Sequence, residues 1–191
     1  MFKRTLIVLL IVIISITACN KKENLYRVVK VKDGDTLELL SPDNVPVTVR
    51  LAEIDCPEKS QAFGQKAKQF TADLCFGKMV SLVVNNRDRY GRTVGQVLLE
   101  DGTNVNYEIV KNGYAWQYQA YSKNPELSLL QEHARQSRLG LWQDSNPTPP
   151  WDFRKGEKQF RQGKTGAAKK SKRTKRTYRK RKQRQADTVV F

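Results

Sequence analysis

The segment 32–58 constrains the fold of this 191-residue chain more than any other, because it gathers several acids and one arginine on short β-prone runs. Asp33-Gly34-Asp35 predicts a tight turn between the runs 26–31 and 36–40, since Asp and Gly tolerate the backbone angles of such turns. Asp35 is therefore expected at the mouth of a strand. The charged residues of the segment that matter below are Asp33, Asp35, Arg50, Asp55 and Glu58.

The run 45–51 alternates apolar and polar residues, which predicts a strand with one buried face. Thr48 and Arg50 share the polar face, opposite Val45, Val47, Val49 and Leu51. The following sequence Asp55-Cys56-Pro57-Glu58 predicts a stiff loop, because proline lacks a backbone donor and holds the preceding residue extended.

Carboxylates gathered at strand ends beside an arginine suit a hard divalent cation and an anionic substrate, because Ca²⁺ and Mg²⁺ prefer oxygen ligands and arginine binds phosphate as a fork. The alternative is that these acids are ordinary solvated loop residues. The downstream run Asp88-Arg89-Tyr90-Gly91-Arg92 favours the first interpretation, since it adds a second arginine on a tight turn.

The segment 25–100 shows a β-β-β-α-β-β pattern, with a helix expected over Ser60–Phe76 and capped by Ser60. Further helices are expected over Asn104–Lys111 and Asn124–Leu139. We expect an α+β protein, mainly β, in which five strands close into a small barrel accompanied by three helices. His133, the only histidine, lies in the third helix with no second ligand at metal-binding spacing.

Six motifs, in this order, resemble the staphylococcal-nuclease-like (thermonuclease) family over roughly Leu25–Trp142. They are VVKVKDGDTLEL, VRLAEIDCPE, FGQKAKQFT, DRYGRTVGQV, VNYEIVKNGYAW and LGLW. The resemblance implies that the barrel is an OB-fold. It also implies a Ca²⁺-dependent endonuclease that hydrolyses the phosphodiester bonds of DNA and RNA with little sequence specificity.

The resemblance also implies roles for individual residues. Asp35 and Asp55 correspond to side-chain Ca²⁺ ligands, and Cys56 stands where the family supplies a backbone carbonyl from a threonine. The Cys56 carbonyl can serve equally well, while its soft sulfur is a poor ligand for Ca²⁺. Asp33 would lie next to the ligands without binding the cation itself.

By the same resemblance, Glu58 corresponds to the general base that holds or deprotonates the attacking water. Arg50 and Arg92 correspond to the two arginines that grip the phosphate. Tyr118 and Tyr121 lie in the stretch where the family keeps two tyrosines lining its nucleotide pocket, although the local spacing differs. Tyr114 and Trp116, nearby, are candidates for stacking or for packing.

A non-catalytic surface lipoprotein that only binds nucleic acid is the alternative function. In that case the barrel would be inert, and some of the acids and arginines of the site would be absent. The chain retains all five of Asp35, Arg50, Asp55, Glu58 and Arg92, which favours the enzyme.

Residues 1–18 predict a lipoprotein signal peptide, with basic Lys3 and Arg4 before a short apolar run and small residues before Cys19. Ile16 three residues before Cys19, with Ala18 directly before it, resembles the bacterial lipobox. The resemblance implies that Cys19 becomes the lipidated first residue, followed by a short linker over 19–24. The alternatives are an uncleaved anchor and a plain signal peptide. We expect an exported protein anchored to a membrane by its N-terminal lipid on the extracytoplasmic side, in the periplasm or at the cell surface.

If Cys19 is lipidated, two cysteines remain, Cys56 and Cys75, and an exported protein holds them in an oxidising compartment. Two states are open for them, a disulfide or free thiols. Cys75 falls on the apolar face of its expected helix, where a free buried thiol is the commoner state.

The C-terminal region 154–191 is expected to be a disordered basic tail, separate from a single thermonuclease-like domain over 25–153. This tail carries +14 of the net charge of +16, and it lacks apolar periodicity. Such a run is either a solvating extension or a device that captures polyanions. Trp151 and Phe153 are expected to anchor an extended segment that covers the domain. We expect the protein to be a monomer.

Overall fold

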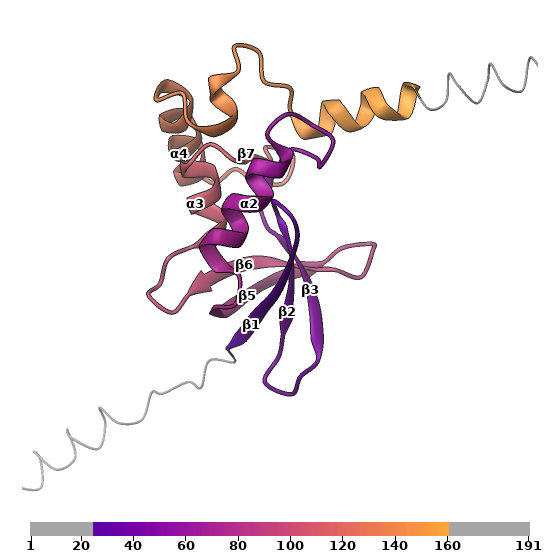
Figure 1. The fold of residues 1–191 in the computed structure, drawn as a ribbon, viewed down its shortest axis with the longest axis vertical. Helices are drawn as coiled ribbons and strands as arrows, with labels where there is room; N and C mark the ends of the chain where they lie inside the picture. The colour runs from indigo at the N-terminus through magenta and orange to yellow at the C-terminus, as the bar shows by residue number, and fades with distance from the viewer. Residues whose placement is uncertain (1–24, 161–191) are drawn as a thin grey trace, which may run out of the picture.

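A computed structural model describes residues 25–160 of the chain, which form a closed five-stranded barrel beside a group of helices (Figure 1). The strands follow each other around the barrel in the order β1-β2-β3-β6-β5. The five-stranded OB-fold barrel expected from the sequence is therefore confirmed. The barrel strands are β1 (Tyr26–Asp33), β2 (Thr36–Leu40), β3 (Pro46–Leu51), β5 (Met79–Arg87) and β6 (Thr93–Leu99).

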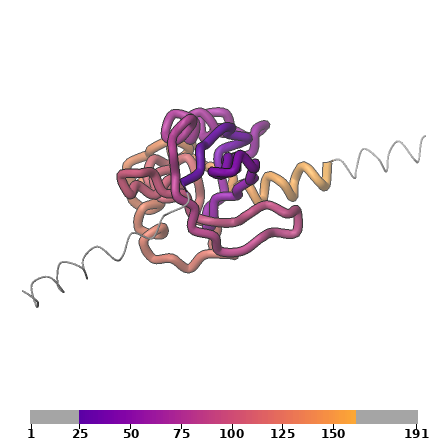
Figure 2. Tube along the Cα trace, turned by 90° about the horizontal axis from the view of Figure 1, so that it is seen from below, coloured from indigo at the N-terminus to yellow at the C-terminus, as the bar shows by residue number. Residues whose placement is uncertain are grey.

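The barrel closes through one parallel and four antiparallel pairings. β3 pairs parallel with β6, and β1 pairs antiparallel with β5. Val49 and Leu51 of β3 are fully buried, as the alternation in this run predicts, and Arg50 between them faces the other way. Figure 2 shows the β5–β6 hairpin extending from the barrel as an arm.

Besides a further helix at the end of the described residues, three α-helices, one 3₁₀ helix and a small two-stranded sheet follow or interrupt the barrel strands. They lie together on one side of the barrel (Figure 1). These elements are α2 (Gly64–Cys75), α3 (Val105–Lys111), α4 (Pro125–Gln136), η1 (Gly140–Gln143), and the strands β4 (Ile54–Asp55) and β7 (Trp116–Gln117).

Helix α2 begins later than the sequence predicts, and Ser60 does not cap it. Its N-cap is Phe63, which has a positive φ of 64° and makes no side-chain capping hydrogen bond. Gly64 is required at the next position because a Cβ there would lie 1.8 Å from the carbonyl oxygen of Glu58. The segment before the helix is therefore a tight loop that carries Glu58, and the first helical turn begins only after it.

Helix α2 supports the turn that carries Asp35. The hydroxyl of Thr71 donates to the carbonyl oxygen of Gly34 at 2.7 Å in a buried contact. A Cβ added to Gly34 would lie 2.7 Å from Cβ of Cys56 and 3.1 Å from Cβ of Ala67. Gly34 thus permits the β1–β2 turn, the loop after β4 and helix α2 to pack in direct contact.

Cys56 and Cys75 are both free and buried, so they form no disulfide. The thiol of Cys75 donates to the carbonyl oxygen of Thr71 at 3.0 Å within α2. Burial raises the pKa of Cys75 to about 12. Both thiols are therefore part of the packed interior, the commoner of the two states considered above.

The ordered structure continues past the expected domain boundary at residue 153. Residues 150–160 form a helix, called here the C-terminal helix, where the sequence suggested an extended cover followed by a disordered tail. The main hydrophobic core includes the inward-facing residues of the barrel strands. The expected anchor Trp151 packs against a second, separate hydrophobic cluster. The buried members of that cluster are Trp116, Ala134, Leu141 and Trp142.

The expected signal peptide with Cys19, the linker over 19–24 and most of the basic tail lie outside the described residues 25–160. Within that range, no helix combines the length and the apolar character that crossing a membrane requires.

Replacing Gly34 by alanine should destabilise the protein, because the new methyl group would overpack the contact between Cys56 and Ala67. Overpacking of this kind typically costs about 1–3 kcal/mol. Urea unfolding followed by circular dichroism would measure the change in free energy of unfolding.

Gly156→Ala is the matched control, because nothing lies within 4 Å of a Cβ at that position of the C-terminal helix. In a helix, alanine is favoured over glycine by about 1 kcal/mol. A Gly34→Ala protein as stable as the wild type would contradict the packing described here.

Candidate active site

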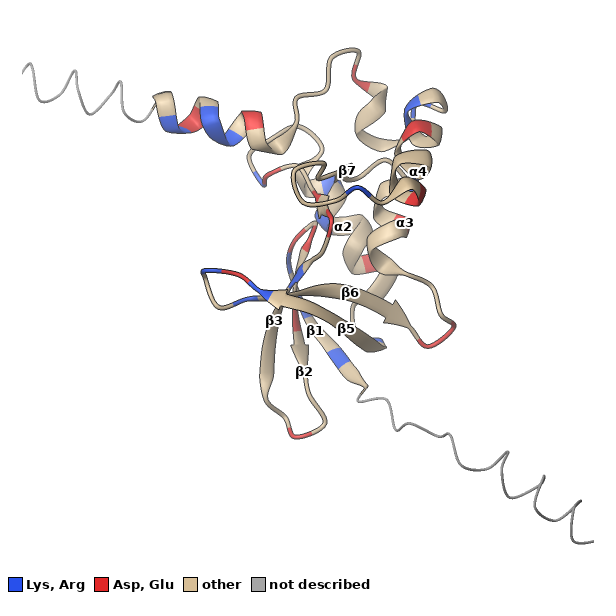
Figure 3. Cartoon of the chain, turned by 180° about the vertical axis from the view of Figure 1, so that it is seen from behind, with Lys and Arg blue, Asp and Glu red and all other residues tan. Residues whose placement is uncertain are grey.

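The centre of the candidate site is a largely buried arginine, Arg50, that bridges two carboxylates. Nη1 of Arg50 lies 2.9 Å from Oδ2 of Asp35, and its Nη2 lies 2.8 Å from Oδ1 of Asp55. The three residues come from the β1–β2 turn, from β3 and from β4. Figure 3 shows acidic and basic residues interleaved where the barrel meets the helices. The structure therefore brings together three residues that the sequence assigned to one site.

The carboxylate of Asp35 is held on several sides. Its Oδ2 accepts the backbone N–H of Cys56 at 2.7 Å, and its Oδ1 accepts the hydroxyl of Thr36 at 3.3 Å. Asp33, expected next to the ligands, accepts the backbone N–H of Asp35 with its own carboxylate at 3.3 Å. These contacts fix the direction of the Asp35 side chain.

Burial sets the electrostatics of this cluster. Desolvation raises the pKa of Asp35 to about 7, although the neighbouring Arg50 acts in the opposite direction. Desolvation opposes the charge of Arg50, but Asp35 and Asp55 outweigh it and raise the arginine's pKa. The site therefore favours additional positive charge, which would stabilise the ionised form of Asp35.

Glu58 lies at the open side of the cluster. Its side chain is 39% exposed, whereas that of Asp55 is 1% exposed. The loop that carries Glu58 is closed by a hydrogen bond of 2.9 Å from the backbone N–H of Gln61 to the carbonyl oxygen of Glu58. The glutamate can therefore reach both solvent and the buried acids.

Arg154 of the C-terminal helix completes the cluster, and the sequence analysis missed it. Its Nη2 lies 2.7 Å from Oδ2 of Asp55, and its Nη1 lies 2.7 Å from Oε1 of Glu58. The same Nη1 also donates to Oδ1 of Asp55 at 3.3 Å. Partial burial opposes the charge of Arg154, but the hydrogen bonds and charges of Asp55 and Glu58 outweigh it and raise the pKa of Arg154.

Arg92 does not contact the acid cluster. Its Nε lies 2.7 Å from Oδ2 of Asp88 across the β5–β6 turn, and its guanidinium lies 5.8 Å from the ring centre of Tyr90. It immediately precedes Thr93, which pairs with Val49 of β3. Arg92 thus stands beside the strand that carries the buried arginine, held by its own aspartate.

Tyr118 and Tyr121, expected at a nucleotide pocket, form an edge-to-face pair with ring centres 4.8 Å apart. Tyr121 is 76% exposed. Trp151 of the C-terminal helix stacks parallel on Tyr118, at 5.4 Å between ring centres and 2° between planes. Trp116 is buried in the second hydrophobic cluster, so it is a packing residue.

Glu53, which lies between Arg50 and Asp55 in the sequence, has a structural role. It has a positive φ of 67° at the turn into β4. Its carboxylate accepts the hydroxyl of Ser122 at 2.9 Å, and its carbonyl oxygen accepts the backbone N–H of Tyr118 at 2.8 Å. Glu53 therefore joins the loop before β4 to the segment that carries the tyrosines.

The donor set fits a hard divalent cation. Asp35 and Asp55 offer carboxylate oxygens, and a backbone carbonyl such as that of Cys56 is a further oxygen donor of the kind Ca²⁺ accepts. Burial and the neighbouring Asp35 hold the pKa of the Cys56 thiol well above its usual range, so the sulfur stays protonated. Within residues 25–160, no three side chains of His, Cys, Asp or Glu form a ligand group, so any cation here would also need carbonyl or water oxygens.

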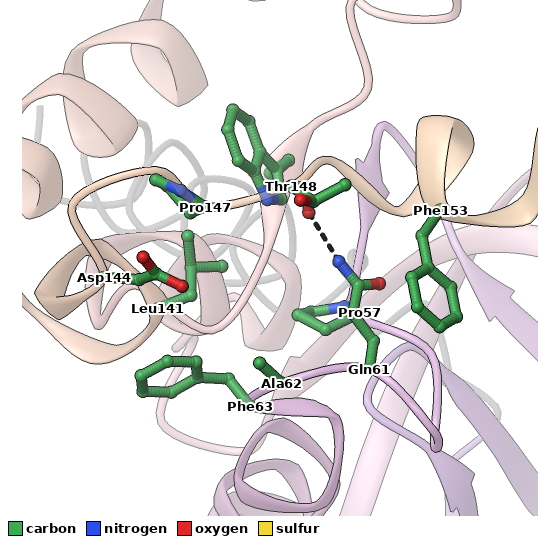
Figure 4. A pocket seen from close by; sticks show the side chains of 10 residues that line it. Pro57, Gln61, Ala62, Phe63, Leu141, Asp144, Pro147, Thr148 and Phe153 are labelled. Carbon is green, nitrogen blue, oxygen red and sulfur yellow. Dashed lines mark hydrogen bonds between the residues drawn. The ribbon is translucent and has the colours of Figure 1, made fainter. Parts of the chain in front are cut away.

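A pocket lies beside the loop that carries Glu58 (Figure 4). A hydrogen bond from the amide of Gln61 to the carbonyl oxygen of Thr148 crosses it and ties this loop to the segment before the C-terminal helix. Phe153 forms part of the wall. The C-terminal segment is therefore joined to the candidate site through this pocket as well as through Arg154.

Several known proteins are similar to this chain in sequence. An "Uncharacterized endonuclease" of Haemophilus influenzae is 47% identical over 150 residues, which cover 78% of this chain and 84% of that relative. A "Micrococcal nuclease" of Shigella flexneri is 42% identical over 141 residues, covering 69% of this chain and 80% of that relative. Residues 48–144 match the family described as "Staphylococcal nuclease homologue". With Arg50, Asp55 and Glu58 of the cluster inside the matched stretch, this chain belongs to the staphylococcal nuclease homologue family.

Proposed function

We propose that the protein is an endonuclease that hydrolyses phosphodiester bonds with the help of Ca²⁺. The observation that carries this proposal is the largely buried bridge of Arg50 between Asp35 and Asp55, with Glu58 at its open side. The names of the relatives from Haemophilus influenzae and Shigella flexneri support a nuclease.

Phosphodiester hydrolysis requires a positioned water and positive charge where the phosphate oxygens gain electron density. Glu58 is exposed enough to hold a water molecule and to accept its proton. Arg50 can stabilise a phosphate oxygen at the inner side of the cluster. Arg92 can bind a second oxygen once its guanidinium turns from Asp88, since arginine binds phosphate as a planar fork.

Asp35, Asp55 and the carbonyl of Cys56 would hold the cation. A Ca²⁺ ion bound there supplies a Lewis acid that polarises a phosphate oxygen. The positive charge of a bound Ca²⁺ would lower the raised pKa of Asp35 and keep that carboxylate ionised at neutral pH.

We infer that both DNA and RNA are substrates, cut with little sequence preference. The groups assigned above would contact phosphate, water or the cation, and such contacts carry no sequence information. The exposed Tyr121 offers its ring to a base, beside Tyr118, whose ring stacks on Trp151. Stacking is tolerant of base identity because every base has a π-face.

A role as a non-catalytic nucleic-acid-binding lipoprotein is less well supported. A binding module has no need of the carboxylate of Glu58 beside Asp55, because acidic groups repel phosphate. The cluster instead places a candidate base next to candidate cation ligands, as hydrolysis requires.

We propose export and lipidation at Cys19, on the basis of the N-terminal sequence. The product would be a monomer held on the extracytoplasmic side of a membrane. The basic residues beyond the C-terminal helix would attract polyanions.

Cleavage should require Ca²⁺ and should stop when it is chelated, because the candidate ligands are hard oxygens. Mg²⁺ should support less activity, since it demands a tighter octahedral geometry. Digestion of plasmid DNA and of RNA would be followed with Ca²⁺, with Mg²⁺ and with EDTA. Undiminished digestion in EDTA would refute the metal assignment.

Glu58→Gln should lower turnover by at least about 10²-fold, because it removes the proton acceptor but keeps the shape of the side chain. Arg92→Ala should lower turnover by a similar factor if the guanidinium stabilises the transition state. Initial rates on a short oligonucleotide would be compared with thermal unfolding curves, which should show that both variants remain folded.

Glu100→Gln is the control, since Glu100 is exposed in the turn after β6. A Glu58→Gln protein with a rate near that of the wild type and of Glu100→Gln would remove Glu58 from the mechanism.

Truncation after Phe160 should weaken binding to nucleic acid more than it lowers turnover. It removes residues 161–191 with +12 of the net charge but keeps the C-terminal helix. Each neutralised phosphate contributes about −0.9 to the log–log salt slope on duplex DNA. Affinity would be measured over a salt series with the Glu58→Gln protein, full-length and truncated.

Turnover on a dinucleotide too short to reach the tail is the control, and it should be unchanged. Equal salt slopes for the two lengths would show that the tail does not bind nucleic acid.

A further inference from the structure

We propose that Arg154 is an internal cation of the site, which holds the carboxylates of Asp55 and Glu58 in the metal-free protein and competes with the divalent cation for Asp55. This inference rests on the proposed cation site. It adds a residue that sets how tightly that site binds its cation.

The oxygens of Asp55 are already occupied by the two arginines. Its Oδ1 accepts from Nη2 of Arg50 at 2.8 Å and from Nη1 of Arg154 at 3.3 Å. Its Oδ2 accepts from Nη2 of Arg154 at 2.7 Å. A Ca²⁺ ion requires oxygens at about 2.3–2.6 Å. A cation on Oδ2 would lie beside the guanidinium of Arg154, and the two positive charges would repel each other. Cation binding therefore favours withdrawal of one arginine.

Arg154 is the arginine that can withdraw. The Arg50 side chain is 15% exposed and is bound to Asp35 as well, whereas that of Arg154 is 35% exposed. Arg50 also donates to the carbonyl oxygen of Leu51 at 3.1 Å, which fixes it to its own strand. Movement of Arg50 would break its contacts with Asp35 and with the carbonyl oxygen of Leu51, while movement of Arg154 breaks only its contacts with Asp55 and Glu58.

The charges of the cluster favour such an exchange. Asp33, Asp35, Asp55 and Glu58 carry four negative charges when ionised, against two positive charges from Arg50 and Arg154. A divalent cation brings one more charge than the guanidinium that it displaces. Withdrawal of Arg154 also releases the carboxylate of Glu58, which its Nη1 holds at 2.7 Å. The exchange would therefore free the candidate base when the cation enters.

The C-terminal helix keeps Arg154 at the site after it withdraws. Trp151, one turn earlier, stacks on Tyr118 and packs edge-on against Trp116 at 5.8 Å between ring centres. A group tethered in this way acts at an effective concentration on the order of millimolar or more. The competition is therefore intramolecular, and dilution does not relieve it.

Calcium affinity of the full-length protein is the direct test, measured by isothermal titration calorimetry at fixed ionic strength. Arg154→Gln should bind Ca²⁺ about tenfold more tightly, within the usual range of coupling between two competing events. Arg154→Lys keeps the charge but loses the planar, two-pronged guanidinium. Its Ca²⁺ affinity should therefore lie between that of the wild type and that of Arg154→Gln. Without Ca²⁺, Arg154→Gln should melt at a lower temperature, because Asp55 and Glu58 lose their counter-charge.

Lys155→Gln is the matched control. Lys155 loses the same charge from the same helix, but it pairs with Asp152 at the surface and its side chain is 72% exposed. Its Ca²⁺ affinity should stay near that of the wild type. An equal gain in Lys155→Gln and Arg154→Gln would overturn the inference, because it would show a general effect of net charge.

The remaining outcomes separate this inference from the proposed function. If wild type and Arg154→Gln bind Ca²⁺ with equal affinity, or the variant binds more weakly, competition is refuted while the cation site stands. If both proteins melt cooperatively but neither binds Ca²⁺, the cation site and the competition fail together.

Discussion

The bridge of Arg50 between Asp35 and Asp55 is the interaction on which the site depends. It joins the β1–β2 turn, β3 and β4, with both nitrogen–oxygen distances below 3 Å. Buried ion pairs repay their desolvation only with good geometry and additional hydrogen bonds. The backbone N–H of Cys56 provides one of these for Asp35. Desolvation nonetheless raises the pKa of Asp35, so a further positive charge beside it would stabilise its ionised form.

The parts of the fold that depend on local patterns could be predicted from the sequence. Strand β2 begins and ends where its β-prone run does, and the alternation in β3 correctly separates the buried Val49 from Arg50. The start of α2 could not be predicted, because it depends on a contact between Gly64 and the carbonyl of Glu58 rather than on a capping residue. Ser60 has the right chemistry for a cap, but it lies within a tight loop.

Arg154 could not be found by composition, since it stands at the head of a strongly basic run that resembles a solvated tail. Its ion pair with Asp55 spans 99 residues of sequence, a separation on which periodicity carries no information. One signal was available. The pair Pro149-Pro150 before Trp151 is typical of a helix start, because proline is favoured in the first helical turn. A helix over 150–160 would have placed Trp151 and Arg154 on one face, one turn apart.

The C-terminal helix therefore has to be counted with the site rather than with the tail. A chain ended at residue 153 would retain the barrel, Arg50 and both aspartates, yet it would lack the guanidinium that balances Asp55 and Glu58 in the absence of a cation. By reciprocal linkage, whatever Arg154 contributes to the stability of the metal-free protein is subtracted from the binding of any cation that displaces it. The position of the boundary between domain and tail therefore affects how tightly the site would bind a cation. That boundary lies beyond Arg154.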